Sequence, residues 1–156
     1  MSQLAKSVYE EQQQSTDESI RGRPVITRFC GTSGGSCTAL KLVQSIVVQI
    51  RYCLDLPYVP TPAGQVFEDA KGELHKLLHE NPVVLFIDSL DQLSDEDEAR
   101  KKISFLAGLD PHVNTRVVVS TLPDEPDPKK AGRWIRFFGC DTRLNLVGTR
   151  QLPTMK

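Results

Sequence analysis

The stretch from residue 82 to residue 93, PVVLFIDSLDQL, constrains the fold of this chain more than any other. Its five consecutive apolar residues, 83–87, predict a β-strand that is buried on both faces, as in a parallel sheet. Asp88 directly follows this run, and open α/β sheets bind ligands at the carboxyl ends of their strands. The stretch therefore predicts an α/β protein with an acidic residue at the ligand-binding edge of its sheet.

A second predicted strand lies earlier in the chain and leads into a glycine-rich loop. Residues 24–29, PVITRF, include the β-branched side chains that strands favour. The loop GTSGGSCT follows, and residues 38–54 then carry apolar side chains at a helical period. Further along the chain we expect a helix over 65–79, a helix that begins at a cap, Ser94, and continues to Leu109, and a strand over 116–121.

Alternating strands and helices with short connections predict a three-layer α/β/α sandwich with a mainly parallel sheet, like that of P-loop NTPases. The predicted core spans residues 24–125. Residues 1–23 are polar and form either a leader helix or a flexible arm, and residues 126–156 form an irregular tail that could hold one edge strand at 143–148. One strand of a complete sheet, between the first predicted helix and Asn81, is not evident in the sequence.

Composition excludes several classes of partner. The chain has 156 residues, which suits one domain, and a formal net charge of −1. That charge predicts neither a nucleic acid nor an anionic membrane as the partner, and no window approaches the roughly 18 apolar residues of a membrane span. The four cysteines lack metal-site spacing, so we expect reduced thiols and a cytoplasmic location.

The glycine-rich loop predicts a phosphate-binding site. Such a loop needs glycines, inward-pointing amides and a helix N-terminus behind it. Against the template GxxxxGK[ST], Gly31 and Thr38 match, whereas Ser36 and Cys37 replace the second glycine and the lysine. Because a charge-assisted hydrogen bond contributes about 1.5–3 kcal/mol, the missing lysine predicts weak affinity. Arg28 and Lys41 are nearby in the sequence, but strand and helix geometry is expected to point them elsewhere. The predicted binding residues are Gly31, Thr32, Ser33, Gly34, Gly35, Ser36, Cys37 and Thr38; the alternative is a strand-to-helix turn that binds nothing.

The acids and hydroxyls at the strand ends complete this prediction. Mg²⁺ would contact Thr38 directly and Asp88 through water. Asp91 could polarise an attacking water, or it could cap the following turn. Ser120 and Thr121 could sense the γ-phosphate, or they could bond to local backbone. The remaining candidate ligands, His75 and His79, stand one helical turn apart and are expected on a solvated helix face.

Three segments carry a resemblance to a known family: RPVITRFCGTSGGSCT, VVLFIDSLDQLSDEDEAR and HVNTRVVVSTLPDE. Together they resemble the nucleotide-binding core of NACHT and WD repeat domain-containing proteins, which belong to the STAND class of P-loop NTPases. That class has a signature of aspartate, small residue, apolar residue and acid, which is similar to residues 88–91, and the resemblance covers residues 24–125. It implies a cytosolic signalling switch that binds ATP or GTP with Mg²⁺ and that associates with itself or with protein partners.

Two departures from the family shape the expected function. The loop lacks its lysine, which predicts slow hydrolysis or none, and the parts that follow the core in the family are missing, so the chain resembles a fragment. We therefore expect a module that binds a nucleoside triphosphate weakly. The alternatives are a protein-interaction module that keeps the fold without a ligand, and a truncated chain that does not fold stably alone.

Overall fold

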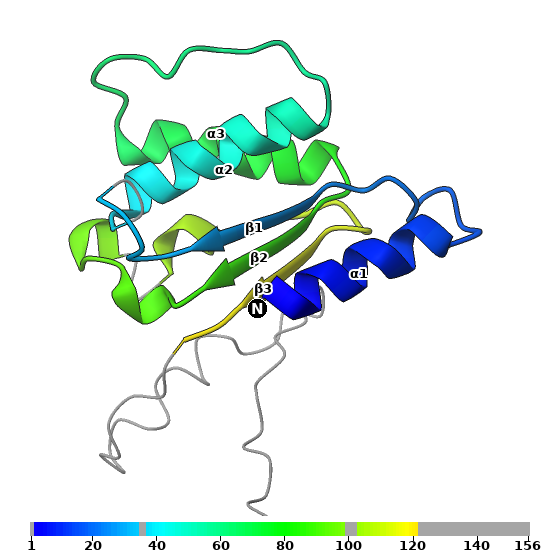
Figure 1. The fold of residues 1–156 in the computed structure, drawn as a ribbon. Coiled ribbons are helices and arrows are strands. Elements are labelled where there is room, and N and C mark those ends of the chain that lie inside the picture. The colour runs from blue at the N-terminus through cyan, green and yellow to red at the C-terminus, as the bar shows by residue number, and fades with distance from the viewer. Residues whose placement is uncertain (1, 35–36, 99–102, 122–156) are drawn as a thin grey trace, which may run out of the picture.

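The computed structural model describes residues 2–34, 37–98 and 103–121. The described residues form helices and parallel strands in an α/β arrangement (Figure 1). Their bounds, in chain order, are α1 Ser2–Gln14, β1 Val25–Phe29, α2 Ala39–Cys53, α3 Phe67–Glu80, β2 Val84–Asp88 and β3 Arg116–Val119. Short 3₁₀ turns occupy Leu90–Gln92, Glu96–Glu98 and Ser104–Leu106.

The sheet has three parallel strands in the order β1-β2-β3 over the described residues. Val25 of β1 lies opposite Val84 of β2, and the register continues to Phe29 opposite Asp88. In β2 the residues before Asp88 are all buried, which confirms the strand predicted to be buried on both faces. The strand that carries Asp88 is therefore the central strand, directly beside the strand that leads into the glycine-rich loop.

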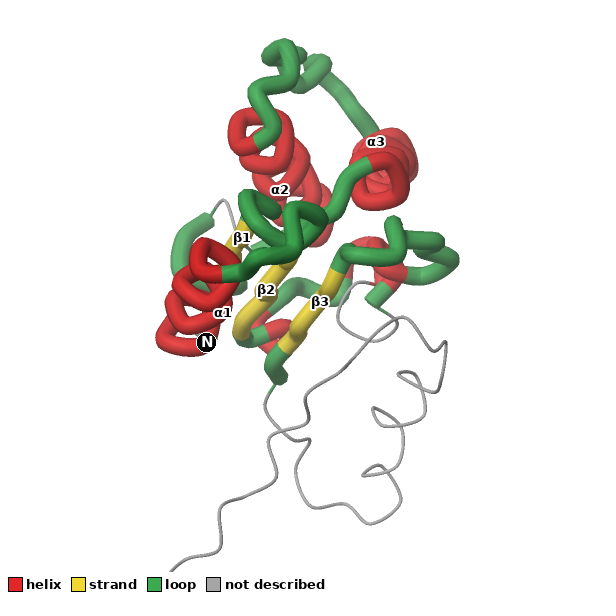
Figure 2. Tube along the Cα trace, turned by 90° about the vertical axis from the view of Figure 1, so that its right-hand side faces the viewer, coloured by secondary structure: helices red, strands yellow, loops and turns green. Residues whose placement is uncertain are grey.

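Helices cover both faces of this sheet (Figure 2). The larger core lies between the sheet and the apolar faces of α2 and α3, where Ile46 and Leu74 are fully buried. On the other face, Ala5 of α1 packs with Val84 and Phe86 of β2. The polar N-terminal segment, for which the sequence left a helix and a flexible arm open, thus contains a helix at residues 2–14.

The β-strands and the helices α2 and α3 lie within two residues of their predicted bounds, but the helix predicted to begin at Ser94 is wrong. The described part of residues 94–109 contains only 3₁₀ turns, and Asp97 and Ile103 have positive φ angles of 54° and 47°. Ile103 and Phe105 are both buried, although residues two apart point to different sides of a helix. Tertiary burial has therefore overridden the local helical pattern.

The connection between α2 and α3, residues 54–66, contains no strand. The segment at 143–148, which was predicted as one edge strand, lies outside the described residues. Phe105, in the described part of the connection between β2 and β3, belongs to the core formed with α3 and so lies on the same side of the sheet as that helix. Residues 88–94 follow the end of β2, which lies beside the end of β1 where the glycine-rich loop begins.

Candidate functional site

The glycine-rich loop and the end of β2 lie against one another at the carboxyl edge of the sheet. The Cys30 amide donates to the carbonyl oxygen of Asp88 at 2.9 Å, and the Ser94 amide donates to that of Cys37 at 2.7 Å. Between these bonds, a side-chain Cβ at position 31 would lie 2.6 Å from the Cβ of Gln92. Residues 88–94 therefore follow the loop from one end to the other, and glycine at position 31 permits their close approach.

Three side chains donate hydrogen bonds to carbonyl oxygens in and before the loop. The Thr32 hydroxyl donates to Phe29 at 3.2 Å, and the Cys37 thiol donates to Ser33 at 3.0 Å. The Lys41 ammonium donates to Gly34 at 3.3 Å. Of the other predicted loop residues, Gly35 and Ser36 lie outside the described residues.

Thr38 begins helix α2 as its N-cap. Its extended backbone precedes the helix, and its hydroxyl oxygen accepts from the Lys41 amide at 3.3 Å. A hydroxyl oxygen has two lone pairs, so this bond leaves one for a further ligand. The free amides of a helix N-terminus and the aligned peptide dipoles favour an anion there. The structure therefore places this N-terminus directly behind the loop, as the sequence predicted.

The structure brings Asp88 and Ser120 together. The Ser120 hydroxyl donates to Oδ1 of Asp88 and accepts from the Ser89 amide at 3.1 Å. The Ser120 carbonyl oxygen also accepts from the Leu90 amide at 2.9 Å. Ser120 thus bonds to local backbone, which was one of its two predicted roles, and it also fixes the orientation of the Asp88 carboxylate. Thr121 follows it and is half-buried.

Asp91 lies in the 3₁₀ turn that directly follows this strand end. It is half-buried, and its Oδ2 accepts from the side-chain amide of Gln92 at 2.5 Å. The carboxylates of Asp88 and Asp91 both help to raise the pKa of the Cys30 thiol to about 12, although burial of that thiol is the larger cause. The two acids therefore lie close enough to Cys30 to disfavour ionisation of its thiol.

The sequence interpretation missed two groups at this site. The expectation that Lys41 points away from the loop is wrong, since its ammonium donates to the Gly34 carbonyl oxygen. The other group is Ser94, whose hydroxyl oxygen is buried with no hydrogen-bond partner within the described parts of the chain. A second nearby cation, Arg28, does not serve the loop, since its guanidinium donates to the hydroxyl and carbonyl oxygens of Ser45 at 3.0 and 2.8 Å.

Other candidate sites are less well supported. The prediction that His75 and His79 lie on a solvated helix face is wrong for His75, which is half-buried and donates from Nε2 to the Phe105 carbonyl oxygen at 2.9 Å. No group of three potential metal ligands occurs among the His, Cys, Asp and Glu residues that the structure describes.

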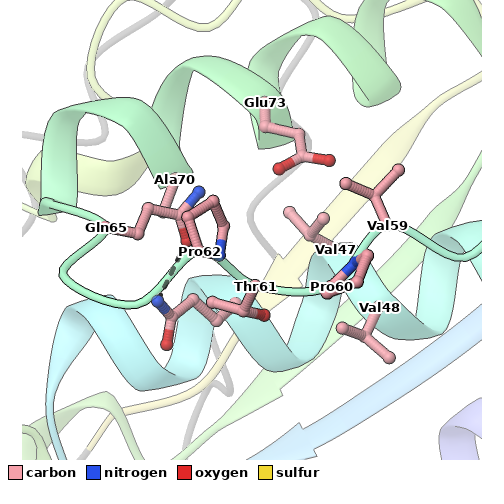
Figure 3. Close-up of a pocket in the computed structure, with 10 residues that line it drawn as sticks. Val47, Val48, Val59, Pro60, Thr61, Pro62, Gln65, Ala70 and Glu73 are labelled. Atoms are coloured by element: carbon pink, nitrogen blue, oxygen red, sulfur yellow. Dashed lines mark hydrogen bonds between the residues drawn. The ribbon is translucent and has the colours of Figure 1, made fainter.

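A pocket beneath the α2–α3 connection contains none of the predicted site residues in its lining (Figure 3). Of the described helices, none is long and apolar enough to cross a membrane.

The fold and this site define an α/β protein with a parallel sheet, whose glycine-rich loop and acidic strand end share one edge. The chain is 32% identical over 105 residues to NACHT and WD repeat domain-containing protein 2 of Mus musculus, and 34% identical over 104 residues to the protein of that name in Homo sapiens. Each match covers 65% of this chain and 6% of the relative. No family model and no solved structure matches the chain.

Proposed function

We propose that this chain is a nucleotide-binding module of a cytoplasmic signalling protein related to the NACHT and WD repeat domain-containing proteins. Its ligand is ATP or GTP with Mg²⁺, bound weakly. The observation that carries the proposal is the position of the glycine-rich loop, which lies alongside residues 88–94 and is bonded to them at Asp88 and Ser94. An anion-binding backbone and a metal-binding carboxylate at one sheet edge are the two parts that a magnesium–triphosphate complex requires.

Most of the predicted residues have a role in this proposal. The amides of the loop and of the first turn of α2 bind the phosphates, and Thr38 contacts Mg²⁺ directly. Asp88, oriented by Ser120, reaches the metal through water. For hydrolysis of the nucleotide, Asp91 orients the attacking water. Turnover is slow or absent, because Cys37 supplies no positive charge to the β- and γ-phosphates.

Lys41 supports the binding of an anion despite the missing loop lysine. Its ammonium already lies at the loop, at 3.3 Å from the Gly34 carbonyl oxygen, and its side chain is exposed. A lysine side chain has several rotatable bonds and presents a compact charge, so it can exchange this carbonyl for a phosphate oxygen. A charge-assisted hydrogen bond of about 1.5–3 kcal/mol would then partly offset the loss at position 37.

One observation favours the alternative, a protein-interaction module that has lost the ligand. The Asp88 carboxylate and the Thr38 hydroxyl both have partners within the protein. The polar groups of the site are thus partly satisfied without a nucleotide, and the fold does not require one. Under this alternative, nucleotide does not change the stability of the chain or its association with other proteins.

Calorimetric titration with Mg-ATP and Mg-GTP tests the proposal. We expect weak binding to the native chain and about tenfold to a hundredfold tighter binding to Cys37→Lys, since that substitution restores one charge-assisted contact. Lys41→Ala should weaken binding about tenfold. The matched control, Lys6→Ala, removes an exposed lysine of α1 that pairs with Glu10 at 3.7 Å and should leave the affinity unchanged. No detectable heat at millimolar nucleotide with either the native chain or Cys37→Lys would contradict the proposal.

A further inference from the structure

The connection between α2 and α3 has a backbone that its own sequence holds extended. Residues 56–62 read LPYVPTP, with prolines at positions 57, 60 and 62. Each proline fixes its own φ at about −65° and drives the residue before it towards the β or polyproline II region. Tyr58 alone escapes both restrictions. The structure accordingly has neither helix nor strand in this segment.

Apolar side chains gather on the surface around this segment. Of the nine exposed large hydrophobic residues in the described parts of the chain, five lie in it or beside it. They are Val48, Tyr52, Tyr58, Val59 and Val66. Tyr52 and Tyr58 are 84% and 74% exposed, so their rings contribute little to the stability of this chain. A concentration of exposed apolar side chains marks an interaction surface.

The segment is anchored at both ends instead of hanging free. At its start, the Arg51 guanidinium donates to the Pro57 carbonyl oxygen at 3.2 Å and pairs with Glu73 of α3 at 2.8 Å. At its end, the side chain of Gln44 donates to that of Gln65 at 3.0 Å, and the Gln65 amide donates to the Pro62 carbonyl oxygen at 3.1 Å. A segment fixed in this way loses little conformational entropy when a partner binds it.

Residues 57–62 are all exposed at the surface. A polyproline II helix has three residues per turn, so Pro57 and Pro60 share one edge and Tyr58 and Thr61 the next. Val59, Pro60, Thr61 and Pro62 all contribute to the lining of the pocket above α2 (Figure 3). The connection arches over the two helices on the side away from the sheet (Figure 1). Pro57 and Pro60 are nevertheless both exposed, so part of each ring is accessible to a partner.

We propose that residues 56–62 are a docking segment for a partner domain that binds proline-rich chains in a groove lined by aromatic side chains, as SH3 and WW domains do. Such grooves recognise two prolines three residues apart on a preformed polyproline II helix, the spacing of Pro57 and Pro60. The inference does not depend on the proposed nucleotide site, since that site is formed by other residues at the carboxyl edge of the sheet.

The test is a binding assay with the whole 156-residue chain, carried out without nucleotide. The fluorescently labelled chain is titrated with purified SH3 and WW domains, and binding is measured by fluorescence anisotropy. We expect at least one domain to bind the native chain with micromolar affinity. Its affinity for the double variant Pro57→Ala/Pro60→Ala should be at least tenfold lower. Tyr58→Ala, which alters only an exposed ring of the segment, should weaken the same complex. The matched control is Val113→Ala, since Val113 is 67% exposed and lies outside the segment.

Two results would overturn the inference. One is that no SH3 or WW domain binds the native chain at concentrations up to about 1 mM. The other is that a domain binds but the double variant and Tyr58→Ala retain the native affinity, which would place the contact elsewhere. Thermal melting followed by circular dichroism shows whether each variant is folded; if the double variant is not, Tyr58→Ala alone decides the outcome.

Discussion

At the scale of single residues, Gly31 determines how closely the two parts of the candidate site approach. Its φ is 73°, in the left-handed region where glycine alone is unstrained. A Cβ at this position would also meet the Cβ of Gln92 at 2.6 Å. Both the turn after β1 and the contact with residues 88–94 therefore require that position 31 has no side chain.

We expect Gly31→Ala to lower the free energy of unfolding by about 1–3 kcal/mol, because alanine would bear both the backbone strain and the collision with Gln92. Urea denaturation followed by circular dichroism measures this change. Gly34→Ala is the control in the same loop, since Gly34 has no positive φ and no atom within 4 Å of a Cβ there; it should change stability by less than about 0.5 kcal/mol. Equal effects of the two substitutions would show that the close approach at Gly31 contributes nothing.

The sequence indicated some residues of the site and not others, for a physical reason. Gly31 and Asp88 could be predicted because each follows a strand, and parallel strands end at the same edge of a sheet. Lys41 and Ser94 could not be assigned, since their contacts depend on a side-chain rotamer and on the path of the chain after β2. Asp91 and Thr121 lie near the predicted edge, but their roles with a nucleotide stay predictions.

At the scale of elements, helix α3 holds the chain that returns to β3. His75 donates to the Phe105 carbonyl oxygen, and His79 contacts the Asp110 carbonyl oxygen through Nδ1 at 2.8 Å. Phe105 itself is fully buried. Two carbonyl groups of this segment thus accept hydrogen bonds from side chains of α3, although the segment forms no α-helix in its described part.

We expect His75→Ala to destabilise the protein by about 1 kcal/mol, because it leaves a carbonyl group beside the core without a donor. His79→Ala removes the more exposed bond, with 63% of that side chain in solvent, and should cost less than half as much. Denaturation gives the two free energies, and hydrogen exchange should accelerate over residues 103–110 in His75→Ala alone. Equal destabilisation by the two substitutions would mean that burial of the His75 bond has no effect.

Helices whose apolar residues recur at the helical spacing were predictable from the sequence. Segments whose conformation depends on tertiary contacts were not. The apolar period of α2 and α3 agrees with their burial, as Val47 and Leu78 illustrate. The acidic run at 94–98 suggested the first turn of a helix, yet the Ser94 amide bonds to the loop at Cys37 instead of starting one. No local pattern contains that contact, because its partners are 57 residues apart (94 − 37).

At the scale of the whole molecule, α1 completes the structure by covering the second face of the sheet. Val84 and Phe86 point to this face and are 3% and 1% exposed, and Ala5 of α1 is 7% exposed against them. The sequence of α1 is mostly polar, so its docking face was not evident; Ala5 is small and allows the helix backbone to approach the sheet. Without α1, β2 would present these apolar side chains to water.

We expect Ala5→Glu to destabilise the chain by about 2–4 kcal/mol. A carboxylate facing Phe86 must either remain unpaired in an apolar contact or displace α1 and expose Val84 and Phe86, whose full burial contributes about 1.5–3 kcal/mol each. Urea denaturation gives the free energy, and increased binding of a hydrophobic dye reports exposure of the sheet face. Gln3→Glu adds the same charge to the same helix at an exposed position and should leave both readouts unchanged. If Ala5→Glu behaves like Gln3→Glu, then α1 does not cover the sheet in solution. The contact of Ala5 with Val84 and Phe86 would then not stabilise β2, the strand that carries Asp88.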